Sequence, residues 1–338
     1  MKRKIAKILE RLRKDKSLRI KVIVVALTTI VLAVCGLVGL EHWDKTRGEF
    51  PEHEVGNGAI EYEGKVYVPK KNIETFLVLG LDKYTGDLSE ESYNNDRCAD
   101  FLMLLVYDND AKTCTAIQIN RDTMATMNIL GVAGNVIDTK KAQITLSHTY
   151  GNGKDVSCRN TANSVSGLLN GVKIDHYISL TMDAVIEFND LLGGVEVEIL
   201  DDFTYFDPAM VQGATITLTG EQALRYVQIR KDLEDSTNAS RMNRQQQYTK
   251  ALYAKFQECM KADEDFVLEA TANLSGHIVS DRSVNQLETL AKKFDEYTFL
   301  GIRNIDGTNA VVNGFVEFTP NEASIQKLVV ELFYTPEQ

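Results

Sequence analysis

Arginine side chains gather in one segment of this acidic chain, between Arg225 and Gln247. The segment reads RYVQIRKDLEDSTNASRMNRQQQ, and its guanidiniums belong to Arg225, Arg230, Arg241 and Arg244. A guanidinium is permanently charged, and its planar fork of donors matches a pair of phosphate or pyrophosphate oxygens. Because the whole chain has a net charge of -11, this cluster indicates an anion-binding site. The alternative is a solvated helix face whose arginines pair with the nearby acids Asp232, Glu234 and Asp235.

Charged side chains also stand at the ends of three apolar runs. Asp82 follows FLVLGL (76–81), Asp100 precedes FLMLLVY (101–107), and Arg121 and Asp122 follow TAIQIN (115–120). Such short runs predict strands that are buried on both faces, and ligands of open α/β sheets bind at strand ends. Carboxylates there could hold Mg²⁺ while the arginines hold phosphate, which together make a phosphoryl-transfer site. Each Asp taken alone could equally be a turn or helix cap.

The elements that must position these groups follow from the apolar patterns. Amphipathic spacing predicts helices at 160–170, 181–192, 220–229, 240–260, 281–293 and 321–333. Gly193 and Gly194 are expected to end the second of these helices. Further strands of the same sheet are expected at 297–303 and 315–319. Strands mixed with covering helices predict an α/β fold, a three-layer α-β-α arrangement around a central mixed sheet.

The N-terminal segment has the pattern of a membrane anchor. Residues 2–21 contain ten basic and two acidic side chains, and the 19 residues Val22–Leu40 carry no charge. At 1.5 Å per residue this uncharged segment matches the thickness of a hydrocarbon core. We therefore predict a basic cytoplasmic tail at 1–21, a transmembrane helix at 22–40 and an extracellular C-terminal part in the cell membrane. A cleaved signal peptide is the weaker alternative, because no small-x-small pattern follows Leu40.

The exported part is long enough for a large core and is strongly acidic. Subtracting the net +8 of the tail from -11 leaves about -19 for the residues after Lys21, which argues against a nucleic-acid partner. Residues 41–71 are expected to form a connector that contains a short hairpin, with strands at 60–62 and 66–68. The remaining residues, 72–335, are long enough for one large domain or two small ones.

Four cysteines lie after the predicted membrane helix, namely Cys98, Cys114, Cys158 and Cys259. In an oxidising compartment they permit two disulfides with three connectivities, and single buried thiols are the alternative. The absence of a CxxC pair argues against a metal-thiolate or redox site.

His148 is interpreted as a structural residue, and no serine-histidine-aspartate arrangement indicates a hydrolase.

Several motifs occur together in an order that one known family shares. They are LVLGLD (77–82), INRDT (119–123), LLGGVEV (191–197), GEQALRYVQIR (220–230) and RMNRQQQ (241–247). Over roughly residues 72 to 335 the chain resembles the LytR-CpsA-Psr family of cell-envelope proteins. The resemblance implies an enzyme of Gram-positive bacteria. It would move an anionic glycopolymer, a teichoic acid or a capsular polysaccharide, from a polyprenyl pyrophosphate carrier to peptidoglycan through a phosphodiester link.

The same resemblance implies roles for the charged residues. Asp82 and Asp100 would ligate Mg²⁺, and Arg121 would hold the pyrophosphate. Asp122 would orient the pyrophosphate or assist the incoming hydroxyl, and either Asp82 or Asp122 could act as the base. The anion clamp would be completed by Arg230, Arg241, Arg244 and Gln245, with Arg225 as a further contributor. The apolar interior would receive the polyprenyl tail.

The chain departs from the family pattern at two positions. The usual Arg-x-Asp is replaced by Arg97-Cys98-Ala99-Asp100, and the usual Arg-x-Arg by Gln228-Ile229-Arg230. Each change removes a guanidinium from the expected site, and a charge-assisted hydrogen bond contributes about 1.5–3 kcal/mol. These changes favour a second hypothesis, a non-catalytic regulator that binds polyprenyl pyrophosphate or glycan. A polyprenyl pyrophosphate hydrolase with the same metal site is the third.

Overall fold

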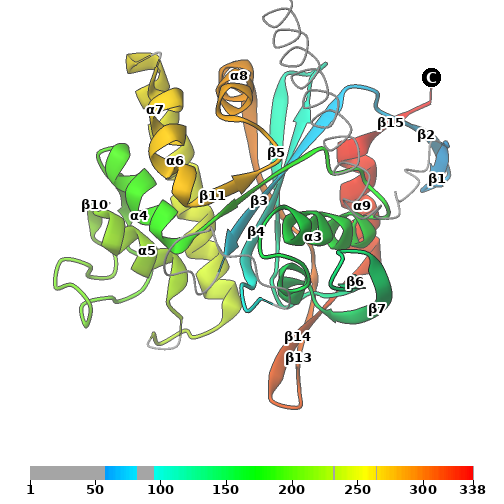
Figure 1. The fold of residues 1–338 in the computed structure, drawn as a ribbon, viewed down its shortest axis with the longest axis horizontal. Coiled ribbons are helices and arrows are strands. Elements are labelled where there is room, and N and C mark those ends of the chain that lie inside the picture. The colour runs from blue at the N-terminus through cyan, green and yellow to red at the C-terminus, as the bar shows by residue number, and fades with distance from the viewer. Residues whose placement is uncertain (1–57, 82–94, 231–232, 264, 338) are drawn as a thin grey trace, which may run out of the picture. The chain divides into compact units, whose positions relative to one another are not determined.

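A six-stranded mixed sheet forms the centre of the fold in the computed structural model (Figure 1). Its strands lie in the order β11 (Ile278–Ser280), β8 (His176–Leu180), β3 (Ile73–Leu81), β4 (Ala99–Asp108), β5 (Thr113–Ile119) and β12 (Thr298–Asn304). The β3–β8 and β5–β12 pairs are parallel, and the other three pairs are antiparallel. The predicted central mixed sheet is therefore confirmed, and the three apolar runs correspond to β3, β4 and β5.

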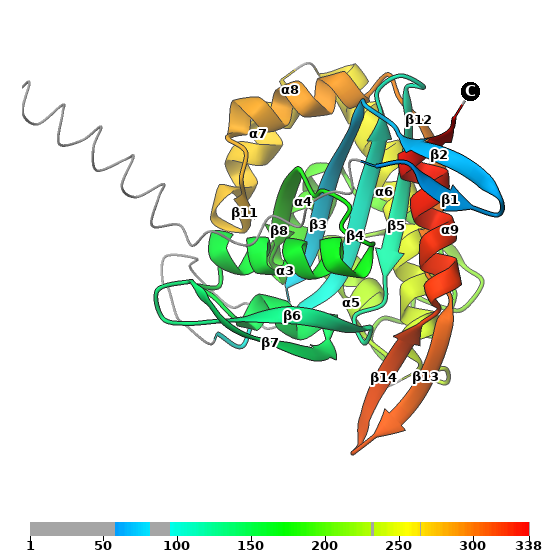
Figure 2. The ribbon, with the colours of Figure 1, turned by 90° about the vertical axis from the view of Figure 1, so that its right-hand side faces the viewer.

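One face of this sheet is tightly packed. Leu77, Leu79, Leu102 and Leu104 alternate along β3 and β4, and all four are completely buried. They share a core with side chains of α3 (Asp155–Leu168) and α9 (Glu322–Phe333), which lie across this face (Figure 2). Because alternate residues of a strand point to opposite faces, each run contributes to two different environments.

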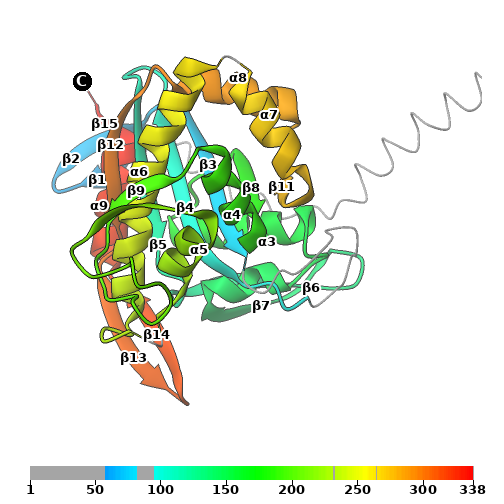
Figure 3. The ribbon, with the colours of Figure 1, turned by 90° about the vertical axis from the view of Figure 1, so that its left-hand side faces the viewer.

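Five helices cover the opposite face of the sheet (Figure 3). They are α4 (Met182–Leu191), α5 (Gly220–Gln228), α6 (Asn238–Ala262), α7 (Phe266–Asn273) and α8 (Val284–Phe294). Residues of all five helices, together with Val78 and Met103 of the sheet, surround a cavity. Helices thus lie on both faces of the sheet, but only one face is solidly filled.

Smaller elements complete the described part of the chain. The predicted hairpin is present as β1 (Ile60–Tyr62) and β2 (Lys65–Pro69), and β15 (Tyr334–Pro336) pairs with β2. Two further antiparallel pairs are β6 (Met124–Leu130) with β7 (Val136–Gln143), and β9 (Val195–Glu198) with β10 (Thr215–Leu218). Short 3-10 helices occupy η1 (Ile144–Thr149) and η2 (Leu274–Gly276). Gly193 and Gly194 have φ values of 76° and 92° after α4, as the sequence predicts.

The segment predicted as a fifth strand of the sheet, 315–319, does not join the central sheet. It forms β14 (Phe315–Pro320), which pairs with β13 (Gly307–Val312) in a hairpin that projects from the domain, and its Phe318 makes one isolated bridge to Thr123 (Figures 1 and 2). The prediction of a strand is confirmed, and the prediction of its sheet is wrong. The reason is the Asn313-Gly314 turn, whose φ values of 51° and 82° pair the two adjacent strands locally.

The structure describes residues 58–81, 95–230, 233–263 and 265–337, all of which belong to the unit Phe50–Gln338. The predicted cytoplasmic tail and transmembrane helix, and also Asp82, lie outside these residues. Within the described residues, no helix has both the length and the apolar character needed to cross a membrane. Cys98, Cys114, Cys158 and Cys259 form no disulfides, and Cys114 and Cys158 are buried.

Leucine-to-alanine substitutions should separate the packed core from the surface. Leu104→Ala should lower the free energy of unfolding by about 2–5 kcal/mol, because it leaves a cavity beneath α3 and α9. Leu300→Ala is the matched control, since Leu300 is 57% exposed, and its effect should stay within about 0.5 kcal/mol. Urea unfolding of both variants measures the difference, and equal losses would contradict this assignment of the core.

Candidate functional site

Asp100, Arg121 and Asp122 meet where β4 begins and β5 ends. Arg121 Nη1 forms an ion pair with Asp100 Oδ2, and Arg121 Nε lies 3.6 Å from Asp122 Oδ1. The turn after β5 fixes this geometry, because the Asp122 amide donates to Asn120 Oδ1 at 2.9 Å. Thr145 Oγ1 donates to Asp100 Oδ1 at 3.2 Å. The antiparallel pairing of β4 and β5 thus brings together charges that stand about twenty residues apart in sequence.

The first turns of α6 bring Arg241 to the same place. Thr237 caps the helix, and the buried residues Asn238, Arg241, Arg244, Gln245 and Tyr248 recur at helical spacing on one face. Arg241 Nη1 lies 3.8 Å from Asp100 Oδ2, and Arg241 Nη2 donates to Asn238 Oδ1 at 2.5 Å. Asn238 Nδ2 in turn donates to Asn120 Oδ1 at 2.8 Å. A chain of amides therefore links Arg241 to the turn that carries Arg121.

The charges at this cluster leave a local excess of positive charge. The pKa of Arg241 is lowered to about 10, chiefly by burial and in addition by the nearby guanidiniums of Arg121 and Arg230. The carboxylates of Asp100 and Asp122 act in the opposite direction. Among the described residues, Arg121, Arg230 and Arg241 contribute three guanidiniums to this balance of charge, and Asp100 and Asp122 contribute two carboxylates. A bound anion would compensate the buried charge of Arg241, because an opposite charge nearby favours the charged form.

Three buried polar atoms at the cluster have no hydrogen-bond partner among the described residues. They are Arg121 Nε, Arg241 Nε and Asp122 Oδ2. Buried polar atoms in folded proteins nearly always have a partner, so such atoms call for an explanation. Two donors and one acceptor at one place offer hydrogen bonds to an anionic ligand and to a hydroxyl group.

A largely apolar cavity reaches this charged cluster. Its volume is about 490 Å³, and Asp100, Arg241 and Gln245 form part of its wall. Beyond them the lining is almost wholly apolar, and includes Phe76, Val78, Met103, Leu105, Val185, Leu224, Leu252, Leu290 and Phe294. A cavity of this size is within the range of sites for small molecules. Its charged end and apolar interior fit a molecule with an anionic head and an apolar tail.

Arg244 occupies a different position from Arg241, although the two stand one turn apart. Its side chain is completely buried, and its Nε donates to the Tyr226 carbonyl at 2.9 Å. Its Nη1 pairs with Asp201, and its Nη2 donates to the Ile229 carbonyl. All three nitrogens therefore have protein acceptors. We assign Arg244 to holding α6 against α5 and the segment after β9, and not to contacting an anion.

The other predicted residues divide between the wall of the cavity and the surface. Gln245 lines the cavity, accepts from Gln118 Nε2 at 3.0 Å and donates to the Val227 carbonyl at 3.1 Å. Arg230 is half-buried just after α5. Arg225 is exposed, and its guanidinium lies 5.3 Å from the centre of the Phe206 ring. It does not line the cavity, so the geometry does not bring it into the cluster.

The two departures from the family pattern can now be located. Arg97 Nη1 donates to the Gly153 carbonyl at 3.2 Å, in the turn that precedes α3. Gln228 lines the cavity and donates to Met182 Sδ at 3.1 Å. An arginine at position 228 would therefore place a positive charge at the cavity wall. This chain has the neutral amide of Gln228 there instead.

Four residues of the network were not among the candidates from sequence, namely Gln118, Asn120, Gln143 and Asn238. Asn120 lies inside the INRDT motif, so its position next to Arg121 was a usable signal. Asn238 stands three residues before Arg241 on the same helix, which is also a local signal. Gln143 donates to Asp122 Oδ1 at 3.2 Å across 21 residues, and no local pattern predicts that contact.

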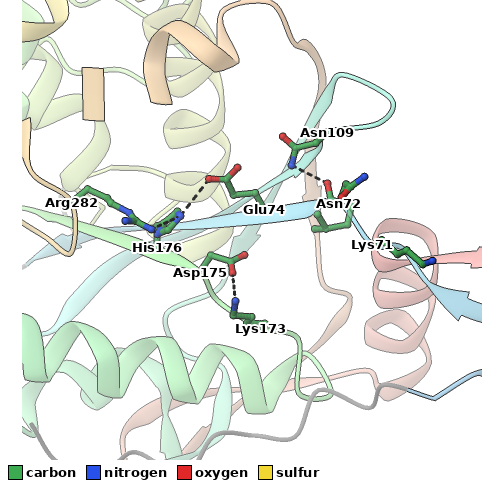
Figure 4. Close-up of a pocket in the computed structure, with 9 residues that line it drawn as sticks. Lys71, Asn72, Glu74, Asn109, Lys173, Asp175, His176 and Arg282 are labelled. Atoms are coloured by element: carbon green, nitrogen blue, oxygen red, sulfur yellow. Dashed lines mark hydrogen bonds and ion pairs between the residues drawn. The ribbon is translucent and has the colours of Figure 1, made fainter. Parts of the chain in front are cut away.

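A second pocket, of about 450 Å³, lies at the opposite end of β3 (Figure 4). Its charged side chains pair with one another, as Lys173 Nζ with Asp175 Oδ1 at 2.8 Å and His176 Nε2 with Glu74 Oε1 at 3.4 Å show. Arg282 Nη2 lies 3.0 Å from His176 Nε2 (Figure 4). Because these contacts join β3, β8 and the segment before α8, we interpret this cluster as a structural connection.

His148 and Cys158 form a buried contact that is chemically inert. His148 Nδ1 donates to the Arg97 carbonyl at 2.8 Å, and its Nε2 lies 3.7 Å from Cys158 Sγ. Burial lowers the pKa of His148 to about 4 and raises the pKa of Cys158 to about 12. The imidazole and the thiol are therefore both neutral at pH 7, as expected for structural residues.

Alanine substitutions should separate the buried arginine from the exposed one. Arg244→Ala should lower the free energy of unfolding by about 3–5 kcal/mol, because it leaves Asp201 without its buried partner. Arg225→Ala should change it by less than about 0.5 kcal/mol. Denaturant unfolding tests both variants. If Arg244→Ala unfolded like the unmodified protein, the structural role of Arg244 would be wrong.

His148 should make the protein less stable in mild acid. The unfolded chain binds a proton at this residue as the pH falls through about 6.5, whereas the native state does so only near pH 4. The free energy of unfolding should therefore fall between pH 6.5 and 4, by on the order of 3 kcal/mol. The measurement is the difference between the unmodified protein and His148→Gln across this range. A constant difference would count against a buried neutral imidazole.

Comparisons with known proteins agree with this architecture. The model of the LytR_cpsA_psr family matches residues 47–333. The polyisoprenyl-teichoic acid–peptidoglycan teichoic acid transferase TagU of Bacillus subtilis is 24% identical over 328 residues, which are 96% of this chain and 97% of that protein. The cell wall biosynthesis protein LcpA of Corynebacterium glutamicum is 27% identical, over 73% of this chain and 51% of that protein.

Solved structures share the fold. TagV of B. subtilis superposes with a TM-score of 0.59 at 20% identity, over 78% of this chain and 96% of that chain. TagT bound to LIIa-WTA superposes with a TM-score of 0.58 at 22% identity, over 82% of this chain and 96% of that chain. The family match spans most of the sequence and all the residues of the charged cluster. The chain therefore belongs to the LytR_cpsA_psr family.

Proposed function

We propose that this protein is a phosphotransferase that moves an anionic glycopolymer from a polyprenyl pyrophosphate carrier to peptidoglycan. The observation that carries the proposal is the juxtaposition of the arginine cluster with the apolar cavity, whose wall includes Asp100 and Arg241. A polyprenyl pyrophosphate has the two parts that this site can hold, an anionic head and a long apolar tail. Membership of the family and the names of relatives such as TagU support the same class of substrate.

The arginine cluster would bind the pyrophosphate. Arg121 and Arg241 each have a buried Nε that lacks a hydrogen-bond partner within the described part of the chain, and the charge of Arg230 acts on Arg241. Preorganised guanidiniums in a partly buried site stabilise negative charge that develops in the transition state, and they need little reorganisation to do so. The arrangement therefore suits cleavage of a phosphate anhydride, whose leaving group is an anionic lipid phosphate.

Asp100 would hold a Mg²⁺ ion together with Asp82. Mg²⁺ is usually bound by one or two carboxylates plus substrate phosphates and water, so a set with one described carboxylate is compatible with it. The described residues contain no group of three or more histidine, cysteine or acidic side chains that could form a metal cage. When bound, the ion would neutralise charge on the pyrophosphate oxygens.

The transfer step would exchange one phosphorus–oxygen bond for another. A peptidoglycan hydroxyl attacks the phosphorus attached to the glycopolymer, the bond to the bridging oxygen breaks, and polyprenyl phosphate leaves. The proton of the attacking hydroxyl goes to a carboxylate, for which Asp122 is the described candidate because its buried Oδ2 has no hydrogen-bond partner. Asp82 is the other candidate from the sequence.

A non-catalytic binder of polyprenyl pyrophosphate is the second candidate function. The observation that favours it is the loss of two guanidiniums, because Gln228 stands on the cavity wall and Arg97 donates to the Gly153 carbonyl. A pyrophosphate hydrolase, with water in place of the peptidoglycan hydroxyl, would use the same residues. The buried acceptor Asp122 Oδ2 beside Arg121 favours an enzyme over a binder.

The location that fits this function is the outer face of the cell membrane. Peptidoglycan lies outside the cytoplasm, and the basic tail at 2–21 followed by the uncharged segment Val22–Leu40 is typical of an anchor with its C-terminal part outside. We therefore propose a single-pass membrane protein with its catalytic domain outside the cell.

Transfer activity tests the proposal most directly. The protein is incubated with a short-chain polyprenyl pyrophosphate oligosaccharide, a peptidoglycan oligomer and Mg²⁺, and the products are followed by mass spectrometry. We expect a phosphodiester-linked adduct that is lost on chelation of the metal. Arg121→Ala should reduce its rate of formation roughly 10²-fold, because it removes a charge that acts on the transition state.

A matched arginine provides the control for this experiment. Arg225→Ala should change the rate by less than about twofold, because Arg225 is exposed and lies against Phe206. Tight lipid binding without adduct or released phosphate would instead support the non-catalytic binder. Released phosphate without adduct would support the hydrolase.

A further inference from the structure

The tip of the β13–β14 hairpin is apolar and exposed. Val311 is 74% exposed, Val312 is 39% exposed and Phe315 is 67% exposed. The ten residues 307–316 contain no charged side chain, although 25% of the residues in the chain are charged. Exposed apolar residues that cluster at one place generally mark a contact surface.

The tip is apolar on both faces of the ribbon. Val312 pairs with Phe315, and the next pair is Val311 with Val316. Successive pairs of an antiparallel ribbon point to opposite faces, so one pair lies on each face. A ribbon that packs one face on protein and leaves the other in water alternates apolar with polar residues. Apolar side chains on both faces are expected where an apolar medium surrounds the tip on every side. The interior of a lipid bilayer is such a medium.

The hairpin is rigidly tied to the candidate site. Its two-residue Asn313-Gly314 turn matches the natural twist of paired strands. At the base, the Phe318 amide donates to the Asp122 carbonyl at 2.8 Å. Gln143 Nε2 donates both to the Val316 carbonyl at 2.6 Å and to Asp122 Oδ1 at 3.2 Å. The position of the tip is therefore defined relative to Asp122.

We propose that the exposed tip of the β13–β14 hairpin, Val311–Phe315, inserts into the outer surface of the lipid bilayer beside the charged end of the cavity. Two residue pairs and the turn extend roughly 10 Å at about 3.4 Å per residue. Interfacial elements bury their apolar parts to a depth of about 5–10 Å, so the length is sufficient.

The net negative charge of the domain favours contact with lipid through a segment that carries no charge. The residues after Lys21 carry a net charge of about -19, which opposes contact with anionic lipids. The charge-free tip is a part of the domain that can approach such a surface without this repulsion. Insertion at this place would bring the charged end of the cavity toward the headgroups, where a polyprenyl pyrophosphate presents its anionic head. This orientation rests on the proposed function, whereas insertion itself does not.

Fluorescence quenching in vesicles tests insertion independently of activity. The chain has one tryptophan, Trp43, so a Trp43→Phe background allows single reporters to be introduced. The full chain is reconstituted in vesicles of phosphatidylglycerol and phosphatidylethanolamine whose acyl chains carry bromine. Phe315→Trp should be quenched strongly. Leu300→Trp, at a position that is 57% exposed on β12, is the matched control and should keep its emission.

A second measurement connects insertion with transfer. In vesicles that contain the long-chain carrier, Val311→Ser combined with Phe315→Ser should slow transfer at least about fivefold, because insertion is weakened. With a water-soluble short-chain carrier the same variant should be as active as the unmodified protein. Loss in both assays would assign the tip a role other than membrane contact.

The two proposals can fail separately. Quenching at Phe315→Trp without any transfer would support insertion and count against the transferase. Equal emission of Phe315→Trp with and without bromine would overturn insertion, whatever the activity. A blue shift of its emission in the absence of lipid would assign the tip to a contact between copies of this chain, and would also overturn the proposal.

Discussion

The arrangement of the site depends on one buried cation. Arg244 is completely enclosed, and such a charge is tolerated only when protein acceptors satisfy it. Its acceptors are Asp201 after β9 and the carbonyls of Tyr226 and Ile229 at the end of α5. These contacts fix the rotation of α6 about its own axis. The next arginine toward the helix start, Arg241, is therefore directed to Asp100 and the wall of the cavity.

One face of the central sheet contributes mainly to stability, and the other face lines the candidate functional site. Side chains such as Leu79 and Leu104 fill the space beneath α3 and α9, where close packing supplies dispersion and removes apolar surface from water. On the other face, Val78 and Met103 line a cavity that the five covering helices leave unfilled. A cavity lacks the packing contacts that would otherwise stabilise the fold. The closely packed face beneath α3 and α9 supplies the stability that the cavity does not. The same sheet can therefore line an apolar binding site on its other face.

Much of this fold could be predicted from local patterns. The apolar runs 76–81, 101–107 and 115–120 correspond to β3, β4 and β5, because a strand that is covered on both faces consists mostly of apolar residues. The predicted helix at 240–260 corresponds to α6 (Asn238–Ala262), since its amphipathic spacing is local information. The helix predicted at 160–170 begins earlier, at Asp155, because Val156 and Cys158 alternate with polar residues in its first turn and give no helical apolar spacing of their own. The strand at 315–319 was assigned to the wrong sheet, because its partner depends on the Asn313-Gly314 turn and not on its own composition.

The sequence by itself determined the types of group at the site, the elements that carry them and the family to which they belong. Those properties depend on residue identity, on periodicity and on the order of motifs. Only the tertiary structure decided which arginine faces a ligand, because Arg241 and Arg244 are chemically identical and one helical turn apart, and only their neighbours distinguish them. It also decided that Gln143 joins Asp122 to the β13–β14 hairpin, a contact between segments far apart in the chain. Such contacts arise when distant segments pack together, and no local pattern encodes them.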